Sequence, residues 1–265
     1  MSDVTHDQVR QIVRQQYSRV AESSDACCNS SAPSCCGTSS PEAVSQALGY
    51  SAHETAAVPA GANMGLGCGN PQAIANLRSG ETVLDLGSGG GFDCFLAARQ
   101  VGEHGRVIGV DMTPAMLSKA RANAEQGGYA NVEFRLGEIE HLPIADRSVD
   151  VILSNCVINL SPDKPRVFAE CFRVLRPGGR LAISDVVAFA DIPAHIREDM
   201  ALLTGCMAGA TPIAELEEML HALGFEDVRI APKEESKSFI REWAPGTPVT
   251  DYVVAATIEA VKPTA

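Results

Sequence analysis

The sequence predicts an α/β fold organised around a mostly parallel β-sheet, and three observations support this prediction. Between residues 82 and 187, short apolar runs alternate with helical patterns, as they do in βαβ units. Two of these runs, 82–86 and 149–153, are apolar along their length rather than at every second position, which is typical of strands buried on both faces. The 265 residues suit one domain of this class with appendages.

The first seventy or so residues are expected to contain a single helix. Residues 5–22 place apolar side chains at helical spacing, with Thr5 as the N-cap. Residues 23–41 are rich in serine, glycine and proline, which predicts a loop. Residues 42–71 are rich in small residues and end in GANMGLGCGNP, so no regular structure is expected there.

Each later element has a local signal. Thr113 is expected to cap a helix that has Pro114 at its first position. The helical run 165–179 is expected to stop at Pro177 and the glycines that follow it. Two late strands, 226–232 and 251–261, suit an antiparallel edge. The other expected strands are 82–86, 106–110, 131–137, 149–158 and 180–187, and the other expected helices are 92–101, 113–126 and 211–223.

The charge balance excludes several partners. The chain has 33 acidic and 21 basic residues, a formal net charge of −12, and no run of lysine and arginine. It is therefore a poor partner for nucleic acid or an anionic membrane. The polar start and the lack of a long apolar stretch predict a cytoplasmic protein, in which the nine cysteines stay reduced. Reduced cysteines at this number suggest metal, metalloid or redox chemistry.

A glycine-rich turn, DLGSGGGFD, follows the strand 82–86 and opens a helix, as in nucleotide-binding turns. Asp85 precedes the glycines and would suit a cation better than a pyrophosphate. Asp111 ends the next strand, where an acidic residue suits a ribose diol. The alternative interpretation is a tight turn that merely requires glycine.

These motifs resemble those of class I S-adenosylmethionine-dependent methyltransferases: VLDLGSGGGFD, GVDMT, GEIEHLP and the run ending in LRPGG. The resemblance implies a Rossmann-like, mostly parallel seven-stranded sheet with helices on both faces, and S-adenosylmethionine as cofactor. It also implies cofactor-binding roles: the turn with Asp85, Gly87, Ser88 and Gly89 for the methionine part, Asp111 for the ribose, Met112, Ile139 and Glu138 for the adenine, and Asn155 beneath the sulfonium.

Three cysteines from distant segments are placed to meet above such a turn. Cys156 follows a strand and faces the crevice at its carboxyl end, Cys68 lies in a loop before the first strand, and Cys206 lies beyond the fifth. Three thiolates suit trivalent arsenic, whose free lone pair can attack a methyl group without a general base. The alternative is that they are buried structural cysteines, the interpretation preferred for Cys94 and Cys171. For Cys68 it is not preferred, because its loop has no core to join.

The segments around these thiols, GLGCGNP, SNCVINLSPDK and TGCMAGA, are similar to segments of arsenite methyltransferases. The resemblance implies that Cys68, Cys156 and Cys206 bind arsenic as the substrate. It also implies that Tyr17 lies on a helix that closes over the cofactor, although an aromatic residue on an apolar helix face is the plainer interpretation. An additional or relay thiol is expected among four N-terminal cysteines, Cys27, Cys28, Cys35 and Cys36. The pair of Cys27 and Cys28 is slightly favoured.

The expected function is methylation of arsenite and then methylarsenite, with glutathione or thioredoxin as the reductant. The chain then divides into an N-terminal helix (1–22), a Cys/Ser-rich mobile segment (23–60), a cofactor-binding domain (61–190) and a substrate-binding and C-terminal region (191–265). Two alternatives remain open. One is a C- or O-methyltransferase of quinone or sterol type, and the other is a non-catalytic protein that sequesters arsenic.

Overall fold

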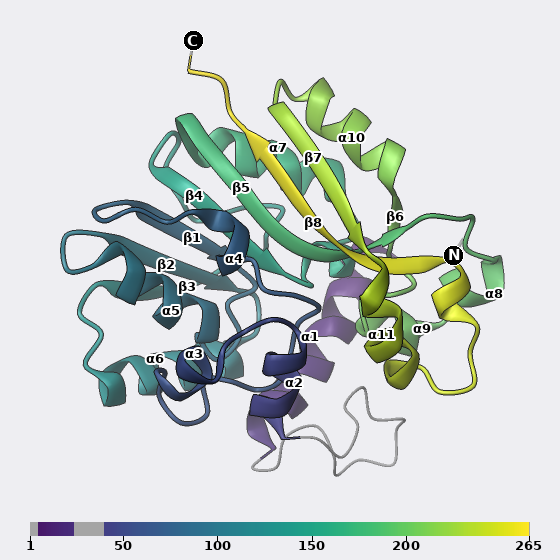
Figure 1. The fold of residues 1–265 in the computed structure, drawn as a ribbon, viewed down its shortest axis with the longest axis horizontal. Coiled ribbons are helices and arrows are strands. Elements are labelled where there is room, and N and C mark those ends of the chain that lie inside the picture. Colours follow the sequence, from purple (N-terminus) through teal and green to yellow (C-terminus); the bar gives the residue numbers. More distant parts are fainter. Residues whose placement is uncertain (1–4, 24–39, 265) are drawn as a thin grey trace.

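The computed structural model describes residues 5–23 and 40–264. Its centre is a sheet in the order β3-β2-β1-β4-β5-β8-β7, with the short β6 paired to β5 (Figure 1). Strands β3 to β5 pair in parallel, whereas β8 runs antiparallel to both β5 and β7. The strands are β1 (Thr82–Leu86), β2 (Arg106–Asp111), β3 (Val132–Leu136), β4 (Val149–Asn155), β5 (Leu175–Ala188), β6 (Thr211–Pro212), β7 (Glu226–Lys233) and β8 (Val253–Val261).

Helices surround this sheet, and an α-helix at the N-terminus lies near its carboxyl edge (Figure 1). The α-helices of the described residues are α1 (His6–Glu22), α2 (Pro41–Ala47), α3 (Ala52–Ala56), α4 (Gln72–Ala75), α5 (Phe92–Val101), α6 (Pro114–Gly127), α7 (Lys164–Val174), α8 (Ala194–Arg197), α9 (Met200–Thr204), α10 (Ile213–Ala222) and α11 (Lys237–Trp243). None of the helices in these ranges is long and apolar enough to cross a membrane.

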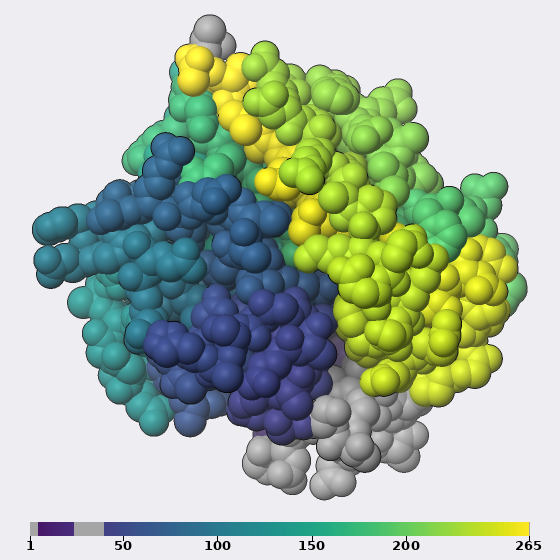
Figure 2. Space-filling model, in the orientation of Figure 1, coloured from purple at the N-terminus to yellow at the C-terminus, as the bar shows by residue number. Residues whose placement is uncertain are grey.

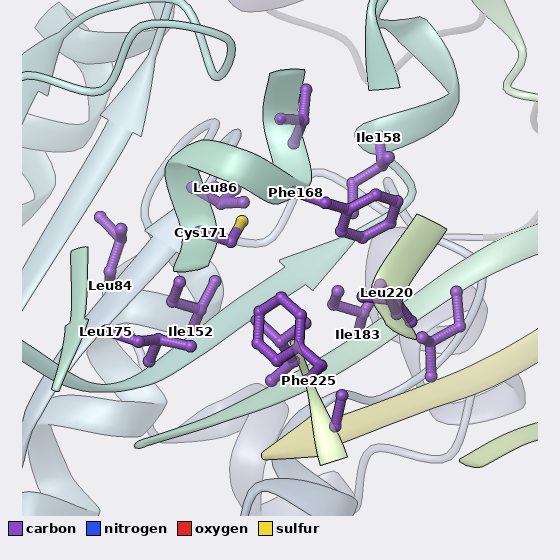
Figure 3. Close-up of a cluster of buried hydrophobic side chains, with 14 of the residues drawn as sticks. Leu84, Leu86, Ile152, Ile158, Phe168, Cys171, Leu175, Ile183, Leu220 and Phe225 are labelled. Carbon is purple, nitrogen blue, oxygen red and sulfur yellow. The ribbon is translucent and has the colours of Figure 1, made fainter. Parts of the chain in front are cut away.

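The strands bury alternate side chains against two layers of helices. One core cluster joins residues such as Leu84 and Ile152 to α7 and α10, and Phe168 is one of its fully buried members (Figure 3). The other joins the intervening residues, such as Val83 and Val151, to α5 and α6. Because successive strand residues point to opposite faces, burial on both faces requires the continuous apolarity seen in the sequence.

The predicted class of fold and most of the element boundaries are confirmed. Strand β1 and helix α5 begin and end where the sequence predicts. Thr5 caps α1 through a reciprocal capping box with Gln8. The late strands β8 and β7 form the antiparallel edge. They belong to the same sheet as the strands of the glycine-rich turn, although the sequence-based division separates them at residue 190.

Five local expectations are wrong. Helix α7 ends at Val174, and the LRPGG run begins β5, in which Leu175 pairs with Val149; Arg176 precedes a proline, which disfavours helix. The fourth strand stops at Asn155 because Cys156 turns into the left-handed region. Thr113 precedes α6 but makes no side-chain cap.

The fourth error concerns residues 42–60. They contain α2 and α3, each begun by a serine cap, Ser40 and Ser51. This segment meets α11 on the face shown in Figure 2, where Phe239 packs against the cluster of Leu48 and Tyr50. An eighth strand, β6, also replaces the start of the helix expected at 211–223.

Candidate active site

A pocket opens at the carboxyl ends of β1, β2 and β4, where the chain turns from strand to helix. Gly87 adopts φ +68°, and a Cβ there would lie 2.1 Å from the side chain of Val157, so only glycine fits. The turn is fixed to the next strand by Asp111, which accepts hydrogen bonds from the amides of Gly89 (3.0 Å) and Thr113 (2.8 Å). Burial raises the pKa of Asp111, although these bonds act in the opposite direction.

Asp85 lies on the inner wall of the pocket beside a second carboxylate that the sequence analysis missed. Asp85 is 3% exposed and accepts a hydrogen bond from the thiol of Cys94 at 3.2 Å. Asp93 accepts bonds from Tyr50 (2.8 Å) and Gln72. Burial and the proximity of Asp93 raise the pKa of Asp85 well above its usual value. Two buried carboxylates favour a cationic group in this part of the pocket.

Asn155 connects this wall to the loop that carries Cys68. Its side-chain oxygen accepts a hydrogen bond from the amide of Cys68 (3.0 Å), and its NH₂ donates to the carbonyl of Gly69 (2.9 Å) and the hydroxyl of Tyr50 (3.1 Å). Gly67 passes so close to Asn155 that a Cβ would lie 2.7 Å from its amide oxygen. Asn155 lines the pocket as expected, and it also positions the loop.

The polar groups of the pocket fit S-adenosylmethionine. The hydroxyl of Ser88 is buried without a hydrogen-bond partner, and a side chain added at Gly89 would meet no atom within 4 Å. Asp85 suits the cationic amino group and Asp111 the ribose diol. The expected residues that line the pocket are Tyr17, Asp85, Gly87, Ser88, Gly89, Asp111, Met112, Ile139, Asn155, Cys156 and Cys206.

Helix α1 forms one side of the pocket, to which it contributes Arg10, Val13 and Tyr17. The hydroxyl of Tyr17 donates to the carbonyl of Thr204 at 3.4 Å. Of the expected residues near the adenine, Glu138 is absent from the pocket lining. Its carboxylate instead pairs with the arginines of α1, and Glu140, two residues later, lines the pocket.

The three cysteines Cys68, Cys156 and Cys206 come together beside this pocket, which Cys156 and Cys206 line and Cys68 does not. They are 1%, 8% and 4% exposed and belong to one apolar cluster. The Cys206 thiol donates to the carbonyl of Cys156 at 2.7 Å, and the sulfur atoms of Cys68 and Cys156 lie within 4.8 Å of each other. The expectation that the loop of Cys68 has no core to join is wrong, because the loop folds onto the sheet and packs into this cluster.

Two of these cysteines have a strained backbone, and burial raises the pKa of two of the thiols. Cys156 and Cys206 adopt φ of 57° and 63°, a left-handed conformation that costs a non-glycine residue about 1–2 kcal/mol. Burial raises the pKa of Cys68 to about 11. Burial and the neighbouring thiols raise that of Cys156 well above its usual value. At neutral pH Cys68 and Cys156 are therefore thiols rather than thiolates.

Comparisons with known proteins agree with this geometry. Residues 77–233 match the family described as "Methyltransferase domain". The arsenite methyltransferase of Halobacterium salinarum is 53% identical over 99% of this chain and 69% of its own length. The chain belongs to the arsenite methyltransferase family. Its fold is that of class I methyltransferases, and its cofactor is S-adenosylmethionine.

Other arsenite methyltransferases match over a smaller share of their length. That of Aquipseudomonas alcaligenes is 47% identical over 62% of this chain and 49% of its own length. A solved structure, an arsenic(III) S-adenosylmethionine methyltransferase from Chlamydomonas reinhardtii, superposes with a TM-score of 0.63. It is 36% identical, and the match covers 85% of this chain and 75% of that one.

The remaining cysteines of this family member have different surroundings. Cys171 is fully buried in the core cluster beside Phe168, as expected (Figure 3). Cys94 is also fully buried, but its thiol bonds Asp85 and so supports the pocket. The expected relay thiols lie outside the described residues: Cys27, Cys28, Cys35 and Cys36.

Proposed function

We propose that this chain transfers methyl groups from S-adenosylmethionine to trivalent arsenic bound by Cys68, Cys156 and Cys206. Arsenite would be the first substrate and methylarsenite the second. The observation that supports this proposal is that three buried thiols from distant segments meet beside the cofactor pocket. Membership in the arsenite methyltransferase family supports the same substrate class.

Substrate binding would not require prior ionisation of the thiols. Neutral arsenous acid condenses with three thiols, so that three As–S bonds form and each thiol proton leaves with an arsenic-bound hydroxyl as water. The raised pKa values of Cys68 and Cys156 suit this reaction. The product is a pyramidal arsenic with three sulfur ligands and a free lone pair.

The arsenic lone pair is the nucleophile, so the protein need not supply a general base. When bound, S-adenosylmethionine supplies an electrophilic methyl group. Asp85 would hold its amino group and Asp111 its ribose, while Met112 and Ile139 would border the adenine. Helix α1, through Val13 and Tyr17, would exclude water from the pocket. No histidine lines the pocket in the described part of the chain.

The As–C bond would form from the arsenic lone pair as the C–S bond of the sulfonium breaks and its electron pair stays on sulfur. Arsenic is thereby oxidised formally from As(III) to As(V). Return to a trivalent product takes two electrons from a pair of thiols, which closes a disulfide. We therefore expect glutathione or thioredoxin to reopen the disulfide between cycles, and to present arsenic as a thiol adduct. The N-terminal cysteines, most directly Cys27 and Cys28, would serve as relay thiols.

The test combines product analysis with binding in single cysteine variants. The chain is incubated with S-adenosylmethionine, arsenite and thiol, and the arsenic species are separated and quantified. Cys68→Ser, Cys156→Ser and Cys206→Ser should each lose methylarsenical formation and weaken arsenite binding. Cys171→Ala is the matched control, because Cys171 is equally buried but lies in the core cluster of Phe168, not in the cluster of the three thiols.

Three outcomes contradict the proposal. The proposal fails if the wild type forms no methylated product and Cys156→Ser binds arsenite as well as the wild type does. Tolerance of Cys68→Ser with turnover of an apolar acceptor would indicate a C- or O-methyltransferase. Stoichiometric arsenite binding without turnover would indicate a sequestering protein.

A further inference from the structure

A buried carboxylate, Asp185 on β5, lies against two of the three thiols, and the proposed methyl transfer does not use it. Asp185 is 2% exposed. One of its carboxylate oxygens and the sulfur atoms of Cys68 and Cys156 all lie within 4.8 Å of one another. The thiol of Cys206 is outside this group and is instead directed at the carbonyl of Cys156.

The orientation of the carboxylate is fixed by its hydrogen bonds. Its Oδ1 accepts from the side chain of Asn159 (2.9 Å) and the amide of Val186 (2.8 Å), and its Oδ2 accepts from the amide of Ile158 (3.0 Å). The backbone of Asn159 also bonds the carboxylate. The group is therefore held rigidly beside the two thiols.

This set of ligands exceeds what trivalent arsenic requires. Pyramidal arsenic takes three sulfur ligands and keeps its lone pair, so a carboxylate adds nothing to its coordination. Zinc-like cations are coordinated tetrahedrally by thiolates and carboxylates. They also need anionic ligands to enter a buried site, and the carboxylate of Asp185 supplies one.

The spacing is compatible with such a cation. Sulfur atoms at the usual Zn–S distance on a tetrahedral ion lie about 3.8 Å apart. The three ligand atoms here are separated by no more than 4.8 Å, so adjustments of about 1 Å would complete the geometry. Cadmium, which is larger, requires less movement.

We propose that Cys68, Cys156 and Asp185 bind one thiophilic divalent cation, zinc or cadmium, with a water molecule as the fourth ligand. Binding forms two metal–sulfur bonds and one metal–oxygen bond, and the two displaced thiol protons pass to solvent. Because two of the ligands are also arsenic ligands, the cation competes with arsenite. Only this competition with arsenite rests on the proposed function.

The experiment uses cadmium chloride as the probe and the full chain with Cys27, Cys28, Cys35 and Cys36 replaced by serine, so that those thiols do not contribute. Calorimetry should show one cadmium ion per chain, and prior addition of arsenite should weaken its binding. Cadmium X-ray absorption should show two sulfur ligands and the remainder oxygen.

Two variants separate the cation site from the arsenic site. Asp185→Asn should lower cadmium affinity at least about tenfold, the loss that even a change outside the ligand shell produces, and change arsenite affinity little. Cys206→Ser should do the reverse, because it removes an arsenic ligand and keeps all three cation ligands.

The proposal is overturned if the wild-type site binds no cadmium or if X-ray absorption finds only sulfur ligands. It is also overturned if Asp185→Asn weakens cadmium and arsenite equally, since Asp185 would then only support the local fold. If Cys206→Ser leaves arsenite affinity unchanged, the three-thiol arsenic site is wrong, and the cadmium measurements still decide the cation site. The X-ray measurement on the wild type does not depend on the folding of any variant.

Discussion

Removing the guanidinium of Arg10 should loosen helix α1 from the pocket. Arg10 is 14% exposed and contacts the carboxylate of Glu140, 3% exposed, at 3.2 Å. Among the described residues, the carboxylate of Glu140 has one other side-chain donor, the hydroxyl of Ser161 at 2.7 Å. In Arg10→Met the apolar stem is kept and the charge of Glu140 is left almost unpaired. Arg14→Met is the control, because Arg14 and Glu138 form a pair that is 36% and 33% exposed.

The expected size of the effect follows from burial. Removing one partner of a buried pair costs about 3–5 kcal/mol, and the partial exposure of Arg10 and the Ser161 bond reduce this to about 2–3 kcal/mol. A change of that size shifts the equilibrium between docked and undocked α1 about 30- to 150-fold. The exposed pair of Arg14 contributes at most about 1 kcal/mol, or about fivefold.

Hydrogen exchange measures this equilibrium directly, because amides in α1 exchange when the helix opens. Amides of residues 9–17 should exchange about 30- to 150-fold faster in Arg10→Met, while those of β4 keep their wild-type rates. Equal rates in Arg10→Met and Arg14→Met would refute the reasoning. So would acceleration that spreads to β4, since the cost would then fall on the whole fold.

Three further predictions concern the thiols, their loop and the core. Burial raises the pKa of Cys68 to about 11, and condensation of its thiol with arsenous acid releases water rather than protons. Arsenite affinity measured by calorimetry should therefore stay constant between about pH 6 and about pH 8. An affinity that increases about tenfold per pH unit would show instead that a thiolate is required. Gly67→Ala should weaken arsenite binding, because its Cβ would displace Asn155, whereas Gly80→Ala, also at positive φ but with no atom within 4 Å, should leave affinity unchanged in the same titration. Phe168→Ala should lower the free energy of unfolding in urea by about 3–5 kcal/mol, because the side chain is fully buried. A loss under about 1 kcal/mol would contradict close packing around Phe168.

The sheet could be predicted because its signals are local. A strand buried on both faces must be apolar along its length, and the turn after β1 needs glycine where the chain passes Val157. The prediction that the LRPGG run ends a helix was wrong because the same residue types also occur at the start of a strand. Only pairing with Val149, distant in the sequence, decides that Leu175 begins a strand.

The site could be predicted in part. The cysteines were found because their residue type stands out near predicted strand ends. Tyr50, Gln72 and Asp93 were missed, because their bonds join segments 43 and 21 residues apart and have no local pattern. Asp185 had a usable signal: a carboxylate inside the apolar strand 180–187 must find partners when buried.

The left-handed backbone at Cys156 and Cys206 bears on how such a site could arise. Both conformations are ones in which glycine is the least strained residue, so an ancestral chain with glycine there would already have these turns. Glycine and cysteine codons can differ by a single base. Two point mutations would then suffice to introduce both thiols without rebuilding the backbone, each at a cost of about 1–2 kcal/mol.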